Sequence, residues 1–373
     1  MECNCILCNK RLNNKIYSLK NMPAFVQNMS DNPESRNDSI DLDLYECDAC
    51  SLIQFNCEPV YYYKDVIHAV GLSDTLKKLR IEQYDDLFNK YSLKGKKVWE
   101  VGCGGGEFLS LWRQFDVIPF GVENNESLVD RAQSENLNVL RGYVDEDYTD
   151  ANGPFDAFTS FNYLEHQPKP SEWVKGIYNN LNDGAVGLLT VPSFEYFIEN
   201  ASYYEFMRDH IAYYTETSLK NLFVLNGFDV LDIGRFNGDT TYIVVQKRSK
   251  ITIPDFEEQR RFLENRINSF AKDNNIKEMA VWGASHQALT MLATLGFDFD
   301  VKYIIDSSPI KWDKYSPVSH LKIVSPDYFY KDSIRDVLIM APAFSYEICK
   351  QIKENKIGIN NIIAVKDDDI LVF

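Results

Sequence analysis

The amino-acid sequence predicts an α/β fold, in which a mostly parallel β-sheet is covered by helices on both faces. Between residues 98 and about 248, short apolar runs alternate with helical patterns, and strands are expected near residues 98, 117, 138, 155, 185, 228 and 240. Regular alternation predicts a parallel sheet, because each helical crossover lies on a face of the sheet. Ligands of such folds bind at the carboxyl ends of the strands.

A turn rich in glycine follows the first of these strands. Residues 98–112 read VWEVGCGGGEFLSLW, which indicates a short apolar strand, a tight turn and the start of a helix. Glycine at positions 102, 104, 105 and 106 lets backbone N–H groups approach a ligand, because no Cβ obstructs them. The turn therefore predicts a nucleotide-type ligand.

The spacing of the glycines excludes two common nucleotide motifs. A dinucleotide fingerprint needs a third glycine where Glu107 stands, and the Gly-Lys-Ser/Thr ending of a phosphate P-loop is missing. The pattern Glu100-x-Gly102-x-Gly104-x-Gly106 instead resembles the first motif of class I S-adenosylmethionine (SAM) methyltransferases. The resemblance implies that this acid and the turn, including Cys103, bind the amino-acid end of SAM.

Two later segments extend this resemblance. The segment FDVIPFGVENN places Glu123 at the tip of the next strand, where the family has an acid that binds the ribose hydroxyls. The segment DAFTSFNYLEHQPKP resembles the fourth strand of the fold and its "LEH" turn beside the cofactor, which implies roles for Asn162, Glu165 and His166. Three elements in this order over about seventy residues make a plain strand-turn-helix connection a poor explanation.

Length and charge limit the protein classes that fit. A chain of 373 residues predicts two or three domains, and 45% hydrophobic residues suffice for a sizeable core. No basic, apolar signal segment opens the chain and no run is long enough to span a bilayer, so a cytoplasmic monomer or homodimer without membrane contact is expected. The net charge of −16 argues against nucleic acid as a partner, although a local pocket can still accept a small anionic substrate.

Cysteines at the amino end have the spacing of metal ligands. Two Cys-x-x-Cys pairs, Cys5 with Cys8 and Cys47 with Cys50, together supply the four thiolates of a closed tetrahedral zinc site. Disulfides are the weaker alternative in a reducing compartment, and Cys3 is a lower-ranked rival ligand. We expect structural Zn²⁺ that holds a short N-terminal module together, with residues 10–46 as an irregular loop.

The segment after this module contains three adjacent tyrosines, Tyr61 to Tyr63, and then a helix. The tyrosines serve either packing or, as with Tyr63, hydrogen bonding at the lip of a pocket. Ser73 is a candidate helix cap, and apolar residues at helical spacing predict an amphipathic helix over about 74–92. That helix would cover the cofactor domain.

An insertion interrupts the regular alternation after the strand GAVGLLTVPS. Residues 194–218 contain Asp209 and His210, followed by Tyr213 and Tyr214. A lone histidine in a loop often packs or caps the next helix, but the place after the fifth strand, the adjacent carboxylate and the two phenols favour a role in substrate chemistry. These four residues are therefore candidate catalytic residues.

The last third of the chain predicts a second α/β domain. An amphipathic helix over 255–273 precedes a strand-turn-helix at 278–296 and the strands VKYIIDSS and DVLIMAP. The second turn has one glycine, and the helix after it could accept a phosphate or ribose, or the domain could be structural or dimerising. Asp306 at a strand end serves either a ribose or a turn. The expected domains are residues 1–72, 73–248 and 249–373.

Taken together, these pieces resemble the bacterial sugar C-methyltransferases over nearly the whole chain. The cysteine pairs with CDACSLIQF, the segment YYYKDVIHAVGLSDT, the SAM domain, DHIAYYT and the C-terminal VWGASHQALTMLA and YIIDSSPIKWDKYSPVSHLKIVSP follow one another as in that family. The resemblance implies a class I (Rossmann-like) SAM methyltransferase sheet with a small N-terminal zinc module and a second C-terminal Rossmann-like domain. Its substrates are nucleotide-linked deoxysugars that carry a ketone.

The family also implies a mechanism. The histidine matching His210 is the base that removes the proton beside the ketone, and the C-terminal domain helps to bind the nucleotide. The resulting enolate attacks the SAM methyl, and Tyr213, Tyr214 or Tyr63 would stabilise its oxygen. This chain has Asp209 and Met207 where the family has glutamate and tyrosine, and RFNGDTTYIVV where the family has a His-Gly-Gly-Ser stretch.

Two other functions remain open. An O-methyltransferase acting on a sugar or another small molecule, in polysaccharide or natural-product biosynthesis, would need a base but no ketone. A binding protein that kept the fold and lost turnover is less compatible with Glu100, the glycines and Glu123.

Overall fold

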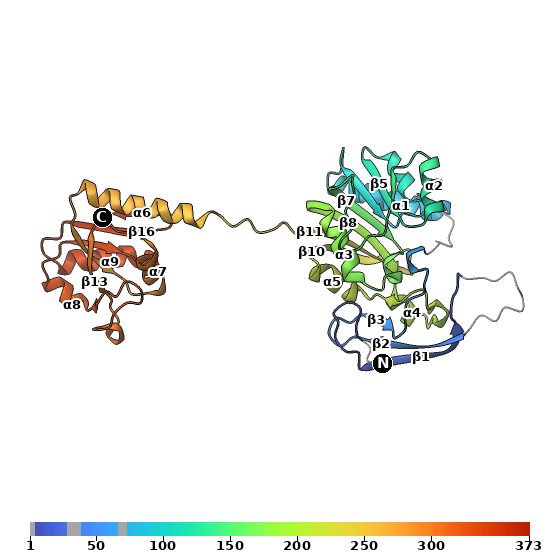
Figure 1. Ribbon diagram of the computed structural model, residues 1–373, viewed down its shortest axis with the longest axis horizontal. Coiled ribbons are helices and arrows are strands. Elements are labelled where there is room, and N and C mark those ends of the chain that lie inside the picture. Colours follow the sequence, from blue (N-terminus) through green and yellow to red (C-terminus); the bar gives the residue numbers. More distant parts are fainter. Residues whose placement is uncertain (1–3, 28–38, 66–72) are drawn as a thin grey trace, which may run out of the picture. The chain divides into compact units, whose positions relative to one another are not determined.

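The computed structural model describes residues 4–27, 39–65 and 73–373 (Figure 1). The chain divides into two compact units, Met1–Lys250 and Ile251–Phe373. The first unit holds a four-stranded and a seven-stranded sheet, and the second holds a six-stranded sheet. The finer division into three domains at residues 72 and 248 stays a prediction.

The seven-stranded sheet has the predicted α/β architecture, with the strand order β10-β11-β8-β7-β4-β5-β6. Strands β4 to β8 pair in parallel, whereas β11 runs antiparallel between β8 and β10. The mostly parallel sheet confirms the predicted fold class. The strands are β4 Lys97–Val101, β5 Ile118–Glu123, β6 Val139–Arg141, β7 Phe155–Phe161, β8 Leu181–Pro192, β10 Phe228–Phe236 and β11 Thr240–Lys247.

Helical segments cover both faces of this sheet, because each contributes an apolar stripe to a buried cluster (Figure 1). One face receives α1 Asp74–Lys90, the 3₁₀ helix η2 Leu109–Gln114 and α2 Glu126–Ser134. The other receives α3 Pro170–Asn179 and α5 Glu216–Leu225. Ser73 caps α1 by accepting a hydrogen bond from the N–H of Leu76 at 3.2 Å, as the sequence predicts.

The N-terminal sheet contradicts the irregular loop expected for residues 10–46. Strands β1 Asn14–Pro23 and β2 Ser39–Glu46 form an antiparallel pair, and β2 also pairs with β3 Ile53–Phe55. The reason lies in β2, where Ile40, Leu42 and Leu44 alternate with aspartates, a period of two that buries one face of a strand. The abundance of Asn, Asp and Ser hid this alternation.

The insertion after β8 completes the N-terminal sheet. Its strand β9, Ala212–Tyr213, pairs with β3, so that the strand order is β1-β2-β3-β9. The insertion also contains α4 Phe194–Glu199 and the 3₁₀ helix η4 Tyr203–Glu205. One buried cluster runs from Leu42 and Phe55 of the N-terminal sheet to Phe158 of the large sheet. The residues around His210 are therefore held by both sheets.

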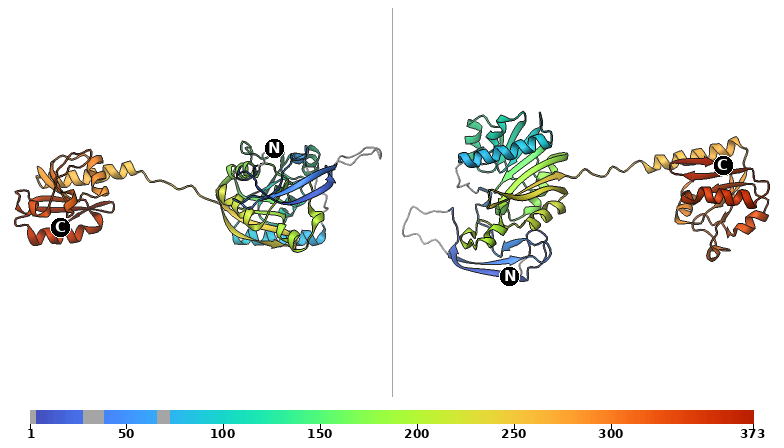
Figure 2. Two further views of the ribbon diagram at one scale, coloured as in Figure 1. Left: turned by 90° about the horizontal axis from the view of Figure 1, so that it is seen from below. Right: turned by 180° about the vertical axis from the view of Figure 1, so that it is seen from behind.

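The second unit is the expected second α/β domain. Its sheet has the order β14-β13-β12-β15-β16-β17 and is parallel except for the last strand. Helices α6 and α7 pack on one face, and α8 and α9 on the other (Figure 2). The elements are β12 Glu278–Trp282, β13 Asp300–Ile305, β14 Ile323–Val324, β15 Asp336–Ile339, β16 Asn361–Lys366, β17 Asp369–Val372, α6 Phe256–Asp273, α7 His286–Thr294, α8 Pro326–Lys331 and α9 Ser345–Asn355.

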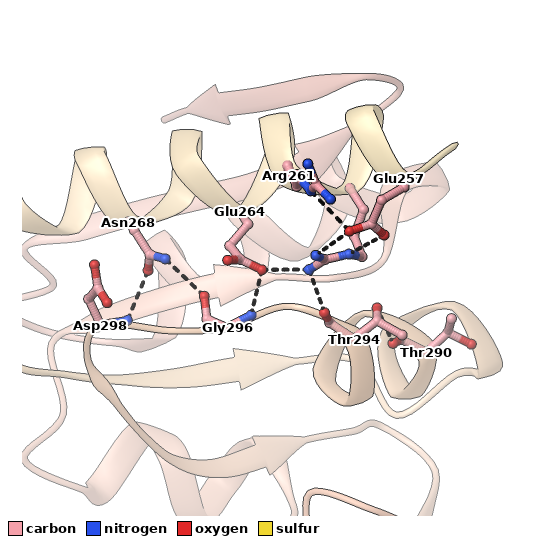
Figure 3. A network of polar contacts seen from close by, with 9 residues as sticks. Glu257, Arg261, Glu264, Asn268, Thr290, Thr294, Gly296 and Asp298 are labelled. Atoms are coloured by element: carbon pink, nitrogen blue, oxygen red, sulfur yellow. Dashed lines mark hydrogen bonds and ion pairs between the residues drawn. The ribbon is translucent and has the colours of Figure 1, made fainter. Parts of the chain in front are cut away.

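A polar network ties α6 to the segment that follows α7 (Figure 3). Glu264 accepts hydrogen bonds from the guanidinium of Arg260 at 2.7 Å and from the N–H of Gly296 at 2.8 Å. Asn268 donates to the carbonyl oxygen of Gly296 at 2.8 Å. These contacts fix the first long helix of the second unit to its own sheet.

In the part of the chain that the structure describes, no helix combines the length and the apolar character that crossing a membrane requires.

Candidate functional site

The glycine turn after β4 has a backbone that only glycine adopts easily. Gly102 has φ +72° and Gly106 has φ +87°, both in the left-handed region. A Cβ on Gly106 would lie 2.2 Å from Cδ1 of Leu137, and one on Gly102 would lie 2.9 Å from the ring of Tyr163. The turn therefore packs too closely for side chains. The helix expected after the turn is the short 3₁₀ helix η2.

Glu100 lies at the carboxyl end of β4, directly before the turn. Its side chain is buried, and Oε2 has no hydrogen-bond partner among the described residues. Burial raises the pKa of Glu100 well above its usual range, while the nearby Arg80 acts to lower it. A buried carboxylate oxygen without a partner fits a ligand that brings its own N–H donors, such as the ammonium group of an amino acid.

Glu123 ends β5 and holds the turn from the neighbouring strand. Its Oε2 accepts a hydrogen bond from the N–H of Gly104 at 3.0 Å, and its Oε1 accepts one from Asn125 at 2.9 Å. Burial raises the pKa of Glu123, and these backbone hydrogen bonds oppose the shift. The second acid predicted from the sequence is thus brought directly against the glycine turn.

A cavity of about 300 Å³ opens beside the turn. Glu100, Gly102, Cys103 and Asn162, four of the residues predicted to bind the cofactor, line it together. Asn162 has φ +48°, and its side-chain oxygen accepts a hydrogen bond from the hydroxyl of Thr190 at 2.8 Å. The cavity is a plausible size for the amino-acid part of SAM, and the unpartnered Glu100 oxygen supports that fit.

Arg80 on α1 is a residue of this cavity that the sequence reasoning missed. Its side chain is buried, with the guanidinium carbon 3.5 Å from the ring centroid of Phe161, and Nη1 donates to Gln83 at 2.6 Å. Burial lowers the pKa of Arg80 to about 10. The signal was available, because an arginine stands on the apolar face of an otherwise amphipathic helix and so points towards the core.

A second group of predicted residues, Glu165, His166 and His210, lies close together in space. Glu165 and His166 lie in the 3₁₀ helix η3, Leu164–His166, directly after Asn162 and Tyr163. The rings of His166 and His210 meet edge to face, with centroids 4.7 Å apart. Burial raises the pKa of Glu165 to about 8 and lowers the pKa of His210 to about 4. The structure therefore brings the "LEH" turn and the insertion together.

Among the described residues, the hydrogen bonds of Asp209 go to groups other than the ring of His210. One carboxylate oxygen accepts from the hydroxyl of Tyr62 at 2.7 Å, and the other accepts from the N–H of Val26 at 3.4 Å. Its carbonyl oxygen accepts a hydrogen bond from Nδ1 of His166 at 2.8 Å. Tyr62, which the sequence reasoning passed over in favour of Tyr63, is the tyrosine that reaches this aspartate.

The three predicted tyrosines have different surroundings. The hydroxyl of Tyr213 is held by the backbone of Met207, accepting from its N–H at 2.9 Å and donating to its carbonyl at 3.1 Å. Tyr214 is buried, and its hydroxyl has no hydrogen-bond partner among the described residues. Tyr63 packs edge to face against Tyr143, with ring centroids 6.1 Å apart. Tyr214 therefore has the hydroxyl with the most unused hydrogen-bonding capacity.

The two cysteine pairs meet in space as predicted. The sulfur of Cys5 lies 3.5 Å from that of Cys50, and Cys8 lies 3.5 Å from Cys47. Four sulfurs at ~2.3 Å from a tetrahedral zinc ion lie ~3.8 Å apart, whereas a disulfide has ~2.05 Å, so the arrangement fits zinc. The hydrogen bond between Cys5 and Cys50 lowers the pKa of Cys5 and raises the pKa of Cys50. Cys3, the rival ligand, lies outside the described residues.

Two family models match this chain, one in each unit. Residues 76–233 match the family model described as "Methyltransferase domain", and residues 252–365 match "C-methyltransferase C-terminal domain". The first match covers the glycine turn, Glu123, Glu165, His166 and His210. The second covers the six-stranded sheet as far as β16.

Curated relatives are similar to this chain over less than a third of its length. An 89-residue stretch is 37% identical to a ubiquinone biosynthesis O-methyltransferase of Coxiella burnetii and covers 22% of this chain. A 118-residue stretch is 30% identical to the enzyme of the same name from Pseudomonas entomophila and covers 29% of this chain. The chain spans 38% and 48% of the length of these two relatives.

Solved methyltransferase structures resemble about half of this chain at low identity. A SAM-dependent methyltransferase from Clostridium acetobutylicum is 13% identical, with a TM-score of 0.39, and covers 50% of this chain and 96% of its own. Magnesium protoporphyrin IX methyltransferase from Synechocystis PCC 6803, solved with bound SAH, is 14% identical, with a TM-score of 0.37 and coverages of 48% and 90%. Likenesses at these scores carry no argument about function.

Proposed function

We propose that this chain, a methyltransferase with a C-methyltransferase C-terminal domain, transfers a methyl group from SAM to a carbon beside a ketone. The substrate we propose is a sugar linked to a nucleotide. One observation carries the proposal: the match of residues 252–365 to a C-methyltransferase domain, in a chain whose other unit has a SAM-type glycine turn. The sugar class rests on the resemblance of the whole sequence to bacterial sugar C-methyltransferases.

The cofactor would lie in the cavity beside the glycine turn. Glu100 would accept from the ammonium group of SAM and Arg80 would pair with its carboxylate, since both line this cavity. Glu123 does not line it, and its two oxygens accept backbone hydrogen bonds from Gly104 and Asn125; its role towards the ribose hydroxyls rests on the resemblance of the sequence. A carboxylate and a guanidinium that line the same cavity suit a zwitterion such as an amino acid. When bound, SAM supplies a methyl group that is open to attack by a carbon nucleophile.

His210 is the base in this proposal. Burial lowers its pKa to about 4, so at neutral pH the ring is uncharged and has a lone pair that can accept the proton beside the ketone. His166 would orient or share that proton, because the two rings are in contact. Holding the base, the carbon and the methyl donor together supplies much of the rate enhancement.

The enolate oxygen needs a hydrogen-bond donor, and we favour Tyr214 among the three candidates because its hydroxyl has no partner among the described residues. Its hydroxyl is buried without a partner, whereas that of Tyr213 is occupied by the backbone of Met207. A preorganised donor in a site that excludes water is worth more than the same donor in water. Tyr63 is the remaining candidate. Asp209 would act as a positioning residue, through Tyr62 and His166.

We further propose that Zn²⁺ bound by Cys5, Cys8, Cys47 and Cys50 has a structural role. The four cysteines occupy all positions of a tetrahedral ion, which leaves none for a substrate. Cys50 also accepts a hydrogen bond from Asn221 of α5 at its carbonyl oxygen, at 3.2 Å. Zinc would therefore fix the N-terminal sheet against the cofactor domain.

The substitution His210→Asn tests the proposed base. We expect the rate of methyl transfer to a nucleotide-linked keto sugar to fall by ~10²–10⁴, with SAM affinity by calorimetry retained. His320→Asn, which changes an exposed histidine of the second unit, is the matched control and should leave both unchanged. Unchanged turnover in the His210 variant would remove this residue from the mechanism.

O-methylation is the second candidate, favoured by the curated relatives that are O-methyltransferases. Only carbon methylation removes the hydrogen on the carbon beside the ketone, so the fate of this hydrogen distinguishes the two reactions. Incubating a nucleotide-linked keto sugar with the protein in heavy water, without SAM, should introduce deuterium there. Methyl transfer without this exchange would favour oxygen. Failure to bind SAM at high concentration would favour a binding protein without turnover.

A further inference from the structure

The region around His210 contains a second set of metal-binding groups, apart from the four cysteines. Glu165 and His166 are supplied by η3, and His210 is supplied by the insertion 44 positions further along the chain. We propose that these three side chains bind one divalent transition-metal ion. The proposal concerns binding and does not require that the chain methylates a sugar.

The geometry brings one ligand atom from each residue close together. A ring nitrogen of each histidine and a carboxylate oxygen of Glu165 all lie within 4.8 Å of one another. Ligand atoms at ~2.1 Å from a shared ion lie at most ~4.2 Å apart, so small rotations of the side chains would bring them to coordination distance. The two histidine rings are also in edge-to-face contact, with centroids 4.7 Å apart.

Two of these residues have buried polar atoms that the protein does not satisfy. Glu165 is 3% exposed, and its Oε2 has no hydrogen-bond partner among the described residues. The same holds for Nδ1 of His210. An unpaired buried carboxylate oxygen costs stability, and so native structures rarely keep one without a ligand, an ion or a water molecule. A bound cation would satisfy both atoms at once.

His166 has the support typical of a metal ligand. Its Nδ1 lies 2.8 Å from the carbonyl oxygen of Asp209, which can only accept, so Nδ1 must carry the proton. In a neutral ring the lone pair is then on Nε2, the other nitrogen. Asp209 is fixed in turn by Tyr62 and Val26. A second hydrogen bond of this kind commonly orients histidines that bind metals.

The ligand types indicate which ion would bind. Two imidazoles and one carboxylate suit Zn²⁺, Co²⁺, Fe²⁺ or Ni²⁺, whereas Mg²⁺ and Ca²⁺ prefer oxygen ligands. Three protein ligands also leave at least one position open, in contrast to the closed four-cysteine site. The expected ion is therefore a transition-metal dication with room for a substrate oxygen or water.

Occupancy of this site would compete with the proposed function. A ring nitrogen that binds a metal has no lone pair left to accept a proton, so His210 cannot be ligand and free base together if the same nitrogen serves both. This consequence rests on the proposed function, and it predicts that bound cation slows proton removal from a keto sugar. The binding itself is independent of that reaction.

The first experiment titrates the full-length, zinc-loaded protein with Co²⁺. We expect one additional ion per chain, with the visible absorption of a nitrogen and oxygen site and without the strong sulfur-to-cobalt bands of a cysteine site. Glu165→Gln and His210→Asn should each weaken this binding by at least ~10-fold. His320→Asn should not change it, and Mg²⁺ should not compete. SAM affinity and far-UV circular dichroism show whether each variant is folded.

Two outcomes would overturn the site. One is saturation with the four-cysteine zinc alone, with no further Co²⁺ bound; the other is Co²⁺ binding of equal strength in folded Glu165→Gln and His210→Asn variants. A separate measurement tests the competition, since saturating Co²⁺ should slow deuterium exchange in the wild type at least ~10-fold, and faster exchange would overturn it. If no keto sugar exchanges under any condition, the proposed function fails while the titration still decides the metal site.

Discussion

Both units of this protein have a turn after a parallel strand that is held by an acid of the next strand, but the polar groups around the two turns differ. In the first unit the turn after β4 is held by Glu123, at the end of the next strand, which accepts from the N–H of Gly104 at 3.0 Å. In the second unit the turn after β12 is held by Asp306, directly after β13, which accepts from the N–H of Ala284 at 2.8 Å. In both units, an acid at the end of one strand thus binds the turn that follows the adjacent parallel strand.

The difference lies in what else satisfies these polar groups. In the second unit Nζ of Lys311 donates to Asp306 and to the carbonyl oxygen of Ala284, both at 3.0 Å. In the first unit the turn adjoins a cavity, and an oxygen of Glu100 has no partner among the described residues. The turn of the first unit can therefore still bind a charged ligand, because an oxygen of Glu100 is unsatisfied. The turn of the second unit has lost part of this capacity, because Lys311 already binds its acid.

The largest expected effect is confined to the first unit. Removing metal with a strong chelator should lower the unfolding temperature of that unit by ~10 °C or more, because the four cysteines lose the ion that would join them. Differential scanning calorimetry would then show the transition of the second unit unchanged. Cys47→Ser should behave like the stripped protein, and Cys57→Ser like the wild type. A chelator-resistant first transition would argue against structural zinc.

The comparison predicts that Glu100 and Asp306 differ in their effect on cofactor affinity. Glu100→Gln should weaken SAM binding by ~10–100-fold, because a charged hydrogen bond contributes ~1.5–3 kcal/mol. Asp306→Asn, the corresponding change in the second unit, should leave SAM binding unchanged. Isothermal calorimetry measures both. Equal losses in the two variants would mean that the second turn also takes part in cofactor binding.

Arg80 provides a finer test of how the first cavity recognises its ligand. Arg80→Met should weaken SAM binding by ~10-fold, because the carboxylate of SAM loses its charged partner. Decarboxylated SAM lacks that group, so the variant and the wild type should bind it with similar affinity. Lys78→Met, an exposed change on the same helix, is the control. Equal weakening for both ligands would show that Arg80 supports the fold of the cavity only.

The smallest effect concerns the lysine of the second unit. Lys311→Met should destabilise that unit by ~1 kcal/mol, because Asp306 loses a partly buried partner. Denaturant unfolding measures this change, with the neighbouring exposed Lys314→Met as the control. No loss of stability would mean that Lys311 does not stabilise the second turn, and the contrast between the units would then rest on Glu100 alone.

Much of the fold could be predicted because strand-helix alternation and the glycine turn are local patterns. The mostly parallel sheet, the helix capped by Ser73 and the second α/β domain all follow from spacing along the chain. The N-terminal strands β1 and β2 were missed because polar residues dominate their composition. The pairing of β9 with β3 joins segments about 160 residues apart, and no local pattern reports such a contact.

The sequence was sufficient to select the residues of the site, but not to predict which of them contact one another. The sequence selected Glu100, Glu123, Glu165 and His210, but it did not reveal that Glu165 and the two histidines converge. It paired Asp209 with His210 because they are adjacent, whereas the Asp209 carboxylate binds Tyr62 and Val26. The place of Arg80 on the buried face of α1 could have been read from the helical spacing, but its contacts with Phe161 of β7 and Phe236 of β10 depend on how that helix lies on the sheet.

The shared edge between β3 and β9 limits how this chain can be recombined with its relatives. A chimaera that replaced the first 57 residues alone would bring a foreign strand against Ala212 and Tyr213, two positions from His210. A working chimaera would therefore have to take residues 194–215 from the same relative as the first 57 residues. The N-terminal strands and the insertion after β8 are thus expected to change together as such enzymes diverge.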